Sequence, residues 1–143
     1  MKLSTRTRYG IRAIIELAQH EAKRPLQLKL IAERQGISVK YLEQLMSLLR
    51  SSGFVRSVRG SKGGYILARA PEHITLDEVF RCLEGPVTTA ECTENQDYCE
   101  RAPDCAAREV WLQVEEAIQR VLSSISLADL VQRVETPASD YQI

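Results

Sequence analysis

The sequence predicts a mainly α fold, a winged helix-turn-helix with a two-stranded wing and a long C-terminal dimerisation helix. Three features lead to this prediction. A short helical pattern and a longer one are separated by a turn that contains glycine, as in a helix-turn-helix. Two short β-like runs then flank a basic, glycine-rich segment. Finally, residues 106–124 read as one continuous helix with a broad apolar face.

The first helix is expected over residues 5–21, where Ser4 or Thr5 can cap its start. Its apolar residues follow the i, i+3, i+4, i+7 spacing of an amphipathic helix. They are Ile11, Ile14, Ile15 and Ala18. A shorter helix follows over Leu28–Gln35, and Gly36 ends it by adopting a left-handed backbone conformation.

Ser38 is expected to cap a third helix over Val39–Ser52, which Gly53 terminates. Its predicted apolar face consists of Val39, Leu42, Leu45, Met46 and Leu49. The β-like runs Phe54–Val58 and Tyr65–Ala68 come next. They flank Arg59-Gly60-Ser61-Lys62-Gly63-Gly64, a tip that can take positive φ and that carries positive charge, which indicates a wing.

Capping signals place the remaining helices. Thr75-Leu76-Asp77-Glu78 is a capping box, so a helix starts there and ends at Gly85-Pro86. After the long helix, Ser126 caps a final helix over Leu127–Val134. Such a wide apolar face on the long helix is hard to cover in a small chain, so we expect it to form the seam of a homodimer. Its apolar residues are Val110, Trp111, Val114, Ala117, Ile118, Val121 and Leu122.

Charge is divided unevenly along the chain, although the formal net charge is zero. Residues 1–70 hold fourteen Lys and Arg against four acids, whereas residues 71–143 hold five Arg against fifteen acids. Such asymmetry suggests that the first half faces a polyanion. We therefore expect a DNA-binding region over residues 1–70, a cysteine loop with dimerisation helices over 71–134, and a disordered tail over 135–143.

The third helix carries side chains suited to reading DNA. With its apolar face buried, it presents Lys40, Tyr41, Glu43, Gln44, Ser47 and Arg50 outward. Gln and Arg can pair with base edges, Glu can accept a hydrogen bond from cytosine, and Ser, Tyr, Lys and Arg can bind phosphates. Arg59 and Lys62 on the slim wing suit a minor groove, where narrow A·T-rich stretches attract cations.

The segment ERQGISVKYLEQLMSLLRSSGFVRSVRGSKGGYIL, which follows KLSTRTRYGIRA, resembles the winged-helix regulators that include IscR, NsrR, RirA and CymR. The resemblance runs from residue 1 to about residue 133 and is closest to the IscR branch. It implies a homodimeric transcription factor that binds a palindromic or pseudo-palindromic operator in double-stranded DNA. The implied base-reading residues are Ser38, Tyr41, Glu43, Gln44 and, on the wing, Arg59. Lys40 and Lys62 depart from the IscR pattern, which places a small residue at the first position and Pro-Gly at residues 61–62.

Three cysteines, Cys92, Cys99 and Cys105, lie in a polar segment rich in carboxylates. Their spacing fits neither a zinc ribbon nor a Cys-x-x-Cys redox motif. Three thiolates favour zinc, copper(I) or an iron–sulfur cluster by softness alone. The resemblance implies an iron–sulfur cluster, with 2Fe–2S favoured and 4Fe–4S as the alternative. It also disfavours the CymR branch, whose members lack this triad.

The resemblance leaves the fourth cluster ligand unassigned. IscR-type proteins place a histidine three residues after the third cysteine, where this chain has Arg108. The nitric-oxide-sensing branch can use an acid of the partner subunit, but the matching position here is Arg8. Nearby carboxylates are the remaining candidates: Glu94, Asp97, Glu100, Asp104 and Glu109. The fourth cysteine, Cys82, is expected to be a small buried apolar residue.

Together these features predict a cytoplasmic DNA-binding regulator, most simply a repressor. The resemblance implies that it responds to iron–sulfur status and controls cluster-assembly genes. The N-terminus lacks the pattern of a signal peptide, and no segment approaches the roughly 20 apolar residues of a membrane span. An enzyme is not expected, because no histidine–carboxylate pair lies near the thiols and no glycine loop is suited to phosphate. Two alternatives remain open: a thiol-, zinc- or nitric-oxide-responsive repressor of the same fold, and a cluster carrier without DNA-binding function.

Overall fold

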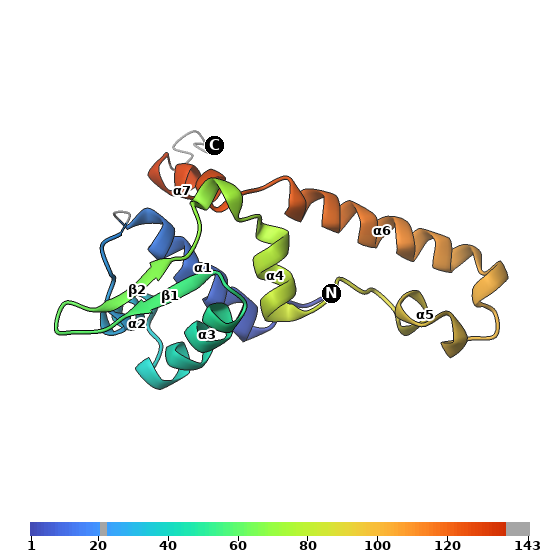
Figure 1. The fold of residues 1–143 in the computed structure, drawn as a ribbon. Coiled ribbons are helices and arrows are strands. Elements are labelled where there is room, and N and C mark those ends of the chain that lie inside the picture. Colours follow the sequence, from blue (N-terminus) through green and yellow to red (C-terminus); the bar gives the residue numbers. More distant parts are fainter. Residues whose placement is uncertain (21–22, 137–143) are drawn as a thin grey trace, which may run out of the picture.

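The computed structural model describes residues 1–20 and 23–136. They form a helical body with a small β-hairpin, from which a long arm projects (Figure 1). The arm consists of helix α6 (Ala106–Ser123), with the short helix α5 (Glu91–Glu94) beside its outer end. The hairpin projects from the opposite end of the body. The predicted fold class, a mainly α winged helix, is confirmed.

The body begins with three helices whose ends lie close to the predicted positions. They are α1 (Thr5–Gln19), α2 (Leu28–Gln35) and α3 (Val39–Ser51). The Ser4 hydroxyl accepts a hydrogen bond from the amide of Thr7 and so caps α1. Gly36 ends α2 with φ +65°, the left-handed conformation expected of it.

The wing is an antiparallel pair of strands, β1 (Val55–Val58) and β2 (Gly64–Leu67), in which Val55 pairs with Leu67. Leu26 extends this sheet along the outer edge of β2, because its N–H donates to the Tyr65 carbonyl and its C=O accepts from the Tyr65 amide, both at 2.9 Å. A Cβ atom at Gly64 would lie 2.4 Å from the carbonyl oxygen of Leu26. Only glycine therefore allows the wing to attach to the segment before α2.

The C-terminal half contains α4 (Leu76–Glu84) and α7 (Leu127–Glu135), and both predicted N-terminal caps are formed as capping boxes. A 3₁₀ turn, η1 (Pro71–His73), precedes α4. The segment predicted as a loop instead contains α5 and two 3₁₀ turns, η2 (Gln96–Tyr98) and η3 (Ala102–Asp104). Helix α7 includes Glu135, the first residue of the expected tail, while residues 137–143 lie outside the described part.

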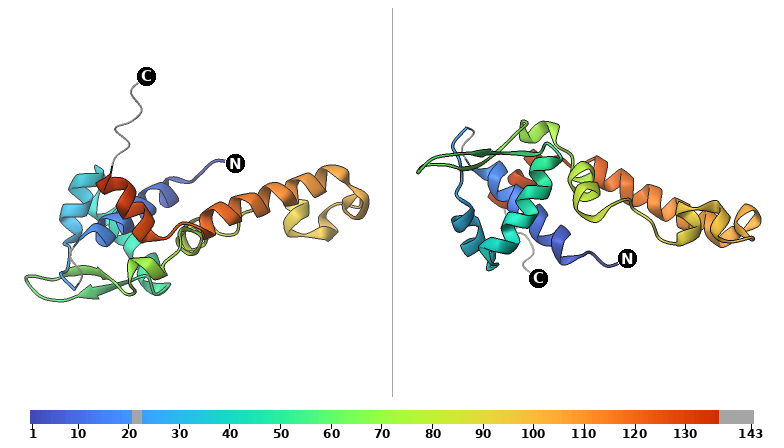
Figure 2. Two further views of the ribbon diagram at one scale, coloured as in Figure 1. Left: turned by 90° about the horizontal axis from the view of Figure 1, so that it is seen from above. Right: turned by 60° about the horizontal axis from the view of Figure 1, so that its bottom comes forward.

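One hydrophobic core joins the two halves of the body. Side chains of α4 and α7 complete a core built from α1, α2 and α3. Its largest fully buried members are Ile14, Ile31, Leu42, Leu45, Met46, Leu49, Ile74, Leu83 and Leu127. Helix α7 thus returns from the arm to pack against α1, as Figure 2 also shows.

Two details of the predicted core are wrong. The fully buried residues of α1 are Thr7, Gly10, Ala13, Ile14 and Leu17, so the buried face is rotated from the predicted one. Of the predicted residues, Ile14 is fully buried, while Ile11 and Ala18 are partly buried against the core. Gly10 allows this rotation because a Cβ atom there would lie 2.6 Å from the side chain of Leu83. Val39 is 40% exposed, because the buried face of α3 begins only at Leu42.

The apolar stripe of α6 is largely uncovered in the single chain. Val110, Trp111, Val114 and Val121 are between 41% and 58% exposed, and Glu115 is the helix's only buried residue. Within the described residues, no helix is both long and apolar enough to cross a membrane.

Candidate nucleic-acid interface and cysteine lobe

Helix α3 displays most of the predicted DNA-contacting side chains to solvent. Lys40, Glu43, Gln44 and Arg50 are exposed along it. Ser38 is also exposed, and its hydroxyl oxygen accepts a hydrogen bond of 3.0 Å from the amide of Tyr41. Ser38 therefore caps α3, and its hydroxyl hydrogen remains available to a phosphate or base.

Tyr41 is half-buried and held by a neighbouring ring. It meets Tyr9 of α1 edge-to-face, with ring centroids 6.4 Å apart and planes at 87°. Arg12 lies over the other ring of this pair, with its guanidinium carbon 5.4 Å from the Tyr9 centroid. The packing fixes where the phenol of Tyr41 emerges beside Gln44.

A hollow of about 350 Å³ lies between the first turns of α1 and the exposed face of α3. Arg6 lines it from α1, opposite Tyr41, Gln44, Ser47 and other residues of α3. Arg6 is absent from the sequence-based prediction, because only the packing of α1 against α3 brings it beside the predicted reading residues.

The wing tip carries the two predicted basic residues in exposed positions. Arg59 and Lys62 lie on a turn that is closed by a hydrogen bond of 3.0 Å from the Gly63 amide to the Gly60 carbonyl. Gly60 has φ +115°, and a Cβ atom at Gly63 would lie 2.1 Å from the Val58 carbonyl oxygen. Both glycines are therefore required for this narrow tip.

Residues 85–105, here called the cysteine lobe, lie along the arm and end at its outer tip (Figure 1). Cys92 is on α5, Cys99 follows η2, and Cys105 is the residue immediately before α6. All three are half-buried free thiols. Within the described residues, no three His, Cys, Asp or Glu side chains are gathered into a metal-binding arrangement. The structure thus places the thiols in one lobe without converging them on one point.

The thiols of Cys92 and Cys99 share an electrostatic neighbourhood around Tyr98. The Tyr98 hydroxyl donates a hydrogen bond to Glu91, and this acceptor and its charge raise the pKa of the phenol. Cys99 and Cys92 both add to the rise. The charges of both thiols therefore act on the same exposed phenol, although six residues separate the two cysteines in sequence.

A buried carboxylate ties the lobe to α6. Glu115 is only 9% exposed, and it accepts hydrogen bonds from the Thr89 amide at 2.6 Å, the Thr89 hydroxyl at 2.9 Å and the Thr93 hydroxyl at 2.6 Å. Burial alone would raise the pKa of Glu115. The bonds from Thr93 and Thr89, with the charge of Arg108, outweigh burial and lower that pKa overall.

Arg108 is a second tie between α6 and the lobe. Its Nε donates a hydrogen bond of 3.0 Å to the carbonyl oxygen of Cys92. At the position where the resemblance would place a histidine ligand, this chain therefore has a side chain that binds the backbone of a cysteine. The carboxylates predicted as alternative ligands, Glu94, Asp97, Glu100, Asp104 and Glu109, are exposed.

At the other end of the lobe, Glu84 joins α4 to the start of α1. It accepts hydrogen bonds from the Ser4 hydroxyl at 2.6 Å, the Ser4 amide at 3.2 Å and the buried hydroxyl of Thr7. The Ser4 and Thr7 hydroxyls lower the pKa of Glu84 against the opposing effect of burial, and nearby Arg6 adds to the lowering. We call the hydrogen-bonded side chains of Ser4, Thr7 and Glu84 the Glu84 latch.

Two remaining predicted positions lie away from the lobe's thiols. Arg8 is exposed and contacts Thr5 of its own helix at 3.4 Å. Cys82, predicted to be buried, is instead half-buried, because it lies where α4 meets the end of α3. Its thiol lies 3.1 Å from the Ser52 hydroxyl oxygen and 3.8 Å from the Leu48 carbonyl oxygen.

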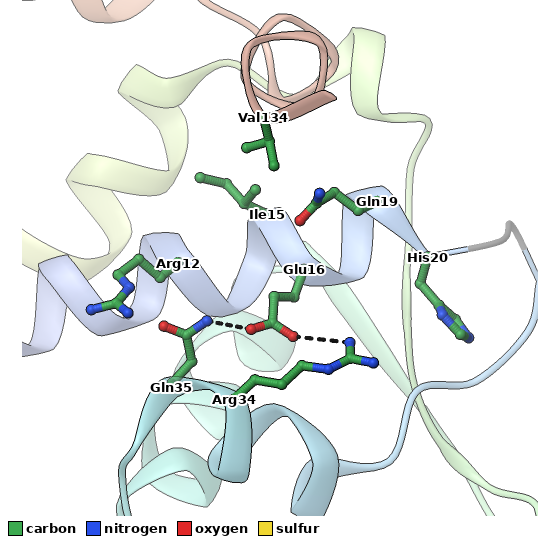
Figure 3. A pocket seen from close by; sticks show the side chains of 8 residues that line it. All are labelled: Arg12, Ile15, Glu16, Gln19, His20, Arg34, Gln35 and Val134. Atoms are coloured by element: carbon green, nitrogen blue, oxygen red, sulfur yellow. Dashed lines mark hydrogen bonds and ion pairs between the residues drawn. The ribbon is translucent and has the colours of Figure 1, made fainter. Parts of the chain in front are cut away.

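A larger pocket of about 460 Å³ lies between α1, α2 and α7 (Figure 3). Glu16 points into it and accepts hydrogen bonds from Gln35 and, at 3.4 Å, from Arg34. These bonds join α2 to α1, so the polar groups of this pocket support the helix-turn-helix itself.

Comparison with known proteins places the chain among transcriptional regulators. The Rrf2 family model, described as an iron-dependent transcriptional regulator, matches residues 3–133. Protein rrf2 of Nitratidesulfovibrio vulgaris is 42% identical over 132 residues, which cover 92% of this chain and 88% of that protein.

Solved structures agree in both fold and sequence. The structure of CymR, the global cysteine regulator of B. subtilis, matches with a TM-score of 0.79 and 42% identity, covering 92% of this chain and 97% of that one. The structure of T. potens IscR matches with the same TM-score and identity, covering 96% of this chain and 91% of that one. Overall similarity therefore does not separate the two kinds of regulator.

Proposed function

The chain belongs to the Rrf2 family of transcriptional regulators, and on this premise we propose that it is a homodimeric DNA-binding regulator whose affinity for its operator depends on an iron–sulfur cluster. Cys92, Cys99 and Cys105 would hold the cluster. We further propose that it acts as a repressor and that its targets include the genes of cluster assembly. The observation that carries the proposal is the placement of three free thiols in one lobe at the end of an uncovered apolar helix.

DNA binding is supported by the surface of α3 and the wing. Gln44 and Arg50 offer base-pairing and phosphate-binding groups, and Glu43 discriminates between bases because its charge repels acceptor edges. Arg59 and Lys62 on the narrow tip are suited to a minor groove. The operator-facing half carries fourteen basic residues against four acidic ones, which favours association with a polyanion.

A homodimer is supported by the uncovered face of α6. Trp111 and Val114 are 43% and 41% exposed on a helix that contacts its own chain on another face. Pairing two copies of α6 would cover this stripe and place two copies of α3 about a two-fold axis. A two-fold dimer reads two half-sites, so the operator is expected to be palindromic or nearly so.

The donor set of the lobe fits a thiophilic group. Three half-buried free thiols in one lobe are soft ligands. When bound, an iron–sulfur cluster supplies a group that oxidants, nitric oxide and iron shortage can alter. Arg108 and Glu115 keep the lobe attached to α6, so that a change at the thiols is transmitted to the dimer helix. Arg108 is not suited to be a ligand, which leaves the fourth position to a carboxylate or an external group.

A thiol-responsive regulator of the same fold is the second candidate. It is favoured by the 42% identity to CymR, described as a global cysteine regulator, and by the absence of a converged metal site among the described residues. A zinc-bound or nitric-oxide-responsive repressor would use the same thiols. A cluster carrier without DNA-binding function would leave the exposed polar face of α3 unexplained.

Replacement of each cysteine by alanine tests the proposal. After anaerobic reconstitution, the Cys92, Cys99 and Cys105 variants are expected to lose iron, sulfide and visible absorbance while remaining folded. Cys82→Ala is the matched control, because this thiol lies outside the lobe and is expected to be dispensable for the colour. Wild-type protein that binds DNA but takes up no iron would favour the thiol-responsive alternative. Colour retained in all three lobe variants would contradict the assignment of the ligands.

A further inference from the structure

The hollow between α1 and α3 has the chemistry of a phosphate site. Its polar lining residues are Arg6, Tyr41, Gln44, Ser47 and Ser51, which supply one guanidinium, three hydroxyls and one amide. None of the described residues that line it is acidic. Such groups bind the sugar–phosphate backbone in protein–DNA complexes.

The hollow also lies where a DNA strand would pass. Tyr41 and Gln44 belong both to it and to the predicted reading surface of α3, so a duplex contacted by these residues would bring a backbone phosphate to Arg6. We propose that this hollow seats a phosphate of the operator backbone and that Arg6 is its principal cation. The inference rests on the proposed DNA-binding function and adds a residue of α1 to that interface.

The Glu84 latch determines where Arg6 stands. Ser4 and Thr7, on either side of Arg6 in the first turn of α1, both donate hydrogen bonds to Glu84. Glu84 is the last residue of α4, and Gly85, which begins the cysteine lobe, takes φ +96°, a conformation that L side chains rarely adopt. Glu84 is therefore a positioning residue: a displacement of the lobe at this glycine is transmitted to the turn that carries Arg6.

Comparison of Arg6→Gln with Arg8→Gln tests the phosphate seat. Both arginines are exposed on α1 and carry the same charge, but only Arg6 lines the hollow. The probes are a 30-base-pair duplex of random sequence and a duplex selected from a random pool by the wild-type protein. Arg6→Gln is expected to weaken binding to both about tenfold, because a phosphate contact carries no sequence information.

The salt dependence of binding gives a second readout. For a dimer with two seats, Arg6→Gln should reduce the slope of log K against log salt by about 1.8, since each phosphate contact contributes about 0.9. Arg8→Gln should change the affinity by no more than about twofold. It should also change the salt slope by only a small part of the value of about 1.8 expected for Arg6→Gln. Equal effects of the two variants would overturn the phosphate seat. Wild-type protein that binds neither duplex would instead refute the proposed function.

A double-mutant cycle tests the positioning role. Thr7→Val removes one hydroxyl from the latch with little change of volume and none of charge, and it is expected to weaken DNA binding about threefold. If the latch acts through Arg6, this effect disappears in the Arg6→Gln background, because contacting or coupled residues are not additive. The same threefold loss in both backgrounds would overturn the positioning role while leaving the phosphate seat standing.

Discussion

Replacing Glu115 by alanine is expected to loosen the cysteine lobe while leaving the winged-helix body folded. Glu115 is the only buried residue of α6, and its carboxylate accepts three hydrogen bonds from Thr89 and Thr93. Alanine keeps the helix but removes every acceptor. The core of the body lies in other helices, so the substitution should act locally.

The size of the effect follows from these contacts. Hydrogen bonds to charged groups contribute about 1.5–3 kcal/mol each. We use the lower part of this range, because Thr89 is exposed and water can replace the lost acceptor. Alanine also removes the cost of burying a carboxylate, which offsets part of the free energy lost with the three hydrogen bonds. The net loss in the free energy that keeps the lobe closed is about 3 kcal/mol. Since 1.36 kcal/mol is a factor of ten, amides protected by the closed lobe should exchange about a hundredfold faster.

Hydrogen–deuterium exchange of the cluster-free protein, followed in peptides covering residues 86–105, measures this directly. Glu116→Ala is the matched control: it removes the same side chain from the next position of α6. The Glu116 side chain is 74% exposed, and its 3.9 Å ion pair with Arg120 contributes at most about 1 kcal/mol. Peptides from α3 provide an internal reference. Equal exchange in the Glu115 and Glu116 variants would refute the role of Glu115 as the anchor of the lobe.

Three further predictions concern the dimer, the wing and pH. Val114→Asp on α6 should give monomers in analytical ultracentrifugation, whereas Val134→Asp, 50% exposed on α7, should leave the dimer intact; dimers in both would exclude α6 as the seam. Arg59→Ala should weaken DNA binding most where A·T-rich sequence flanks the half-sites, and a uniform loss would contradict a minor-groove role. Hydrogen bonds from Ser4 and Thr7 hold the pKa of Glu84 below its ordinary value of 4.5. The ionised Glu84 side chain therefore stabilises the folded state above pH 4.5, and this stabilisation is lost as the pH falls through the lowered pKa of the folded protein. The difference in Tm between wild type and Glu84→Gln should therefore be largest near neutral pH and shrink below about pH 4.5, and a constant difference would contradict the latch.

Local signals in the sequence predicted the helix ends because caps are local chemistry. Thr75 and Ser126 form capping boxes with residues three positions away, and Gly36 adopts the left-handed conformation that ends α2. None of these depends on distant contacts. The helix ends therefore fall within two residues of their predicted positions.

Features that depend on distant contacts were missed. Thr7 is buried because its hydroxyl donates a hydrogen bond to Glu84, 77 positions away. The spacing of apolar residues alone could therefore not place Thr7 in the core. From the sequence alone, Glu115 is an acid on a helix with an apolar stripe and would be expected to face solvent. In the structure, Thr89 and Thr93 pack against it and donate hydrogen bonds to its carboxylate. Arg6 comes beside the exposed polar side chains of α3 only because α1 packs against α3. Each of these residues gains its role from an element far away in the sequence.

DNA binding compared in two states of the same preparation shows whether the cluster regulates this protein. Protein is purified anaerobically, iron and sulfide are counted per chain, and its Kd for the selected duplex is measured before and after the cluster is removed by a chelator. We expect iron and sulfide to be present and Kd to differ at least about tenfold between the states, which corresponds to a coupling free energy of about 1.4 kcal/mol. Equal Kd values in the loaded and cluster-free states would contradict the claim that the cluster regulates DNA binding.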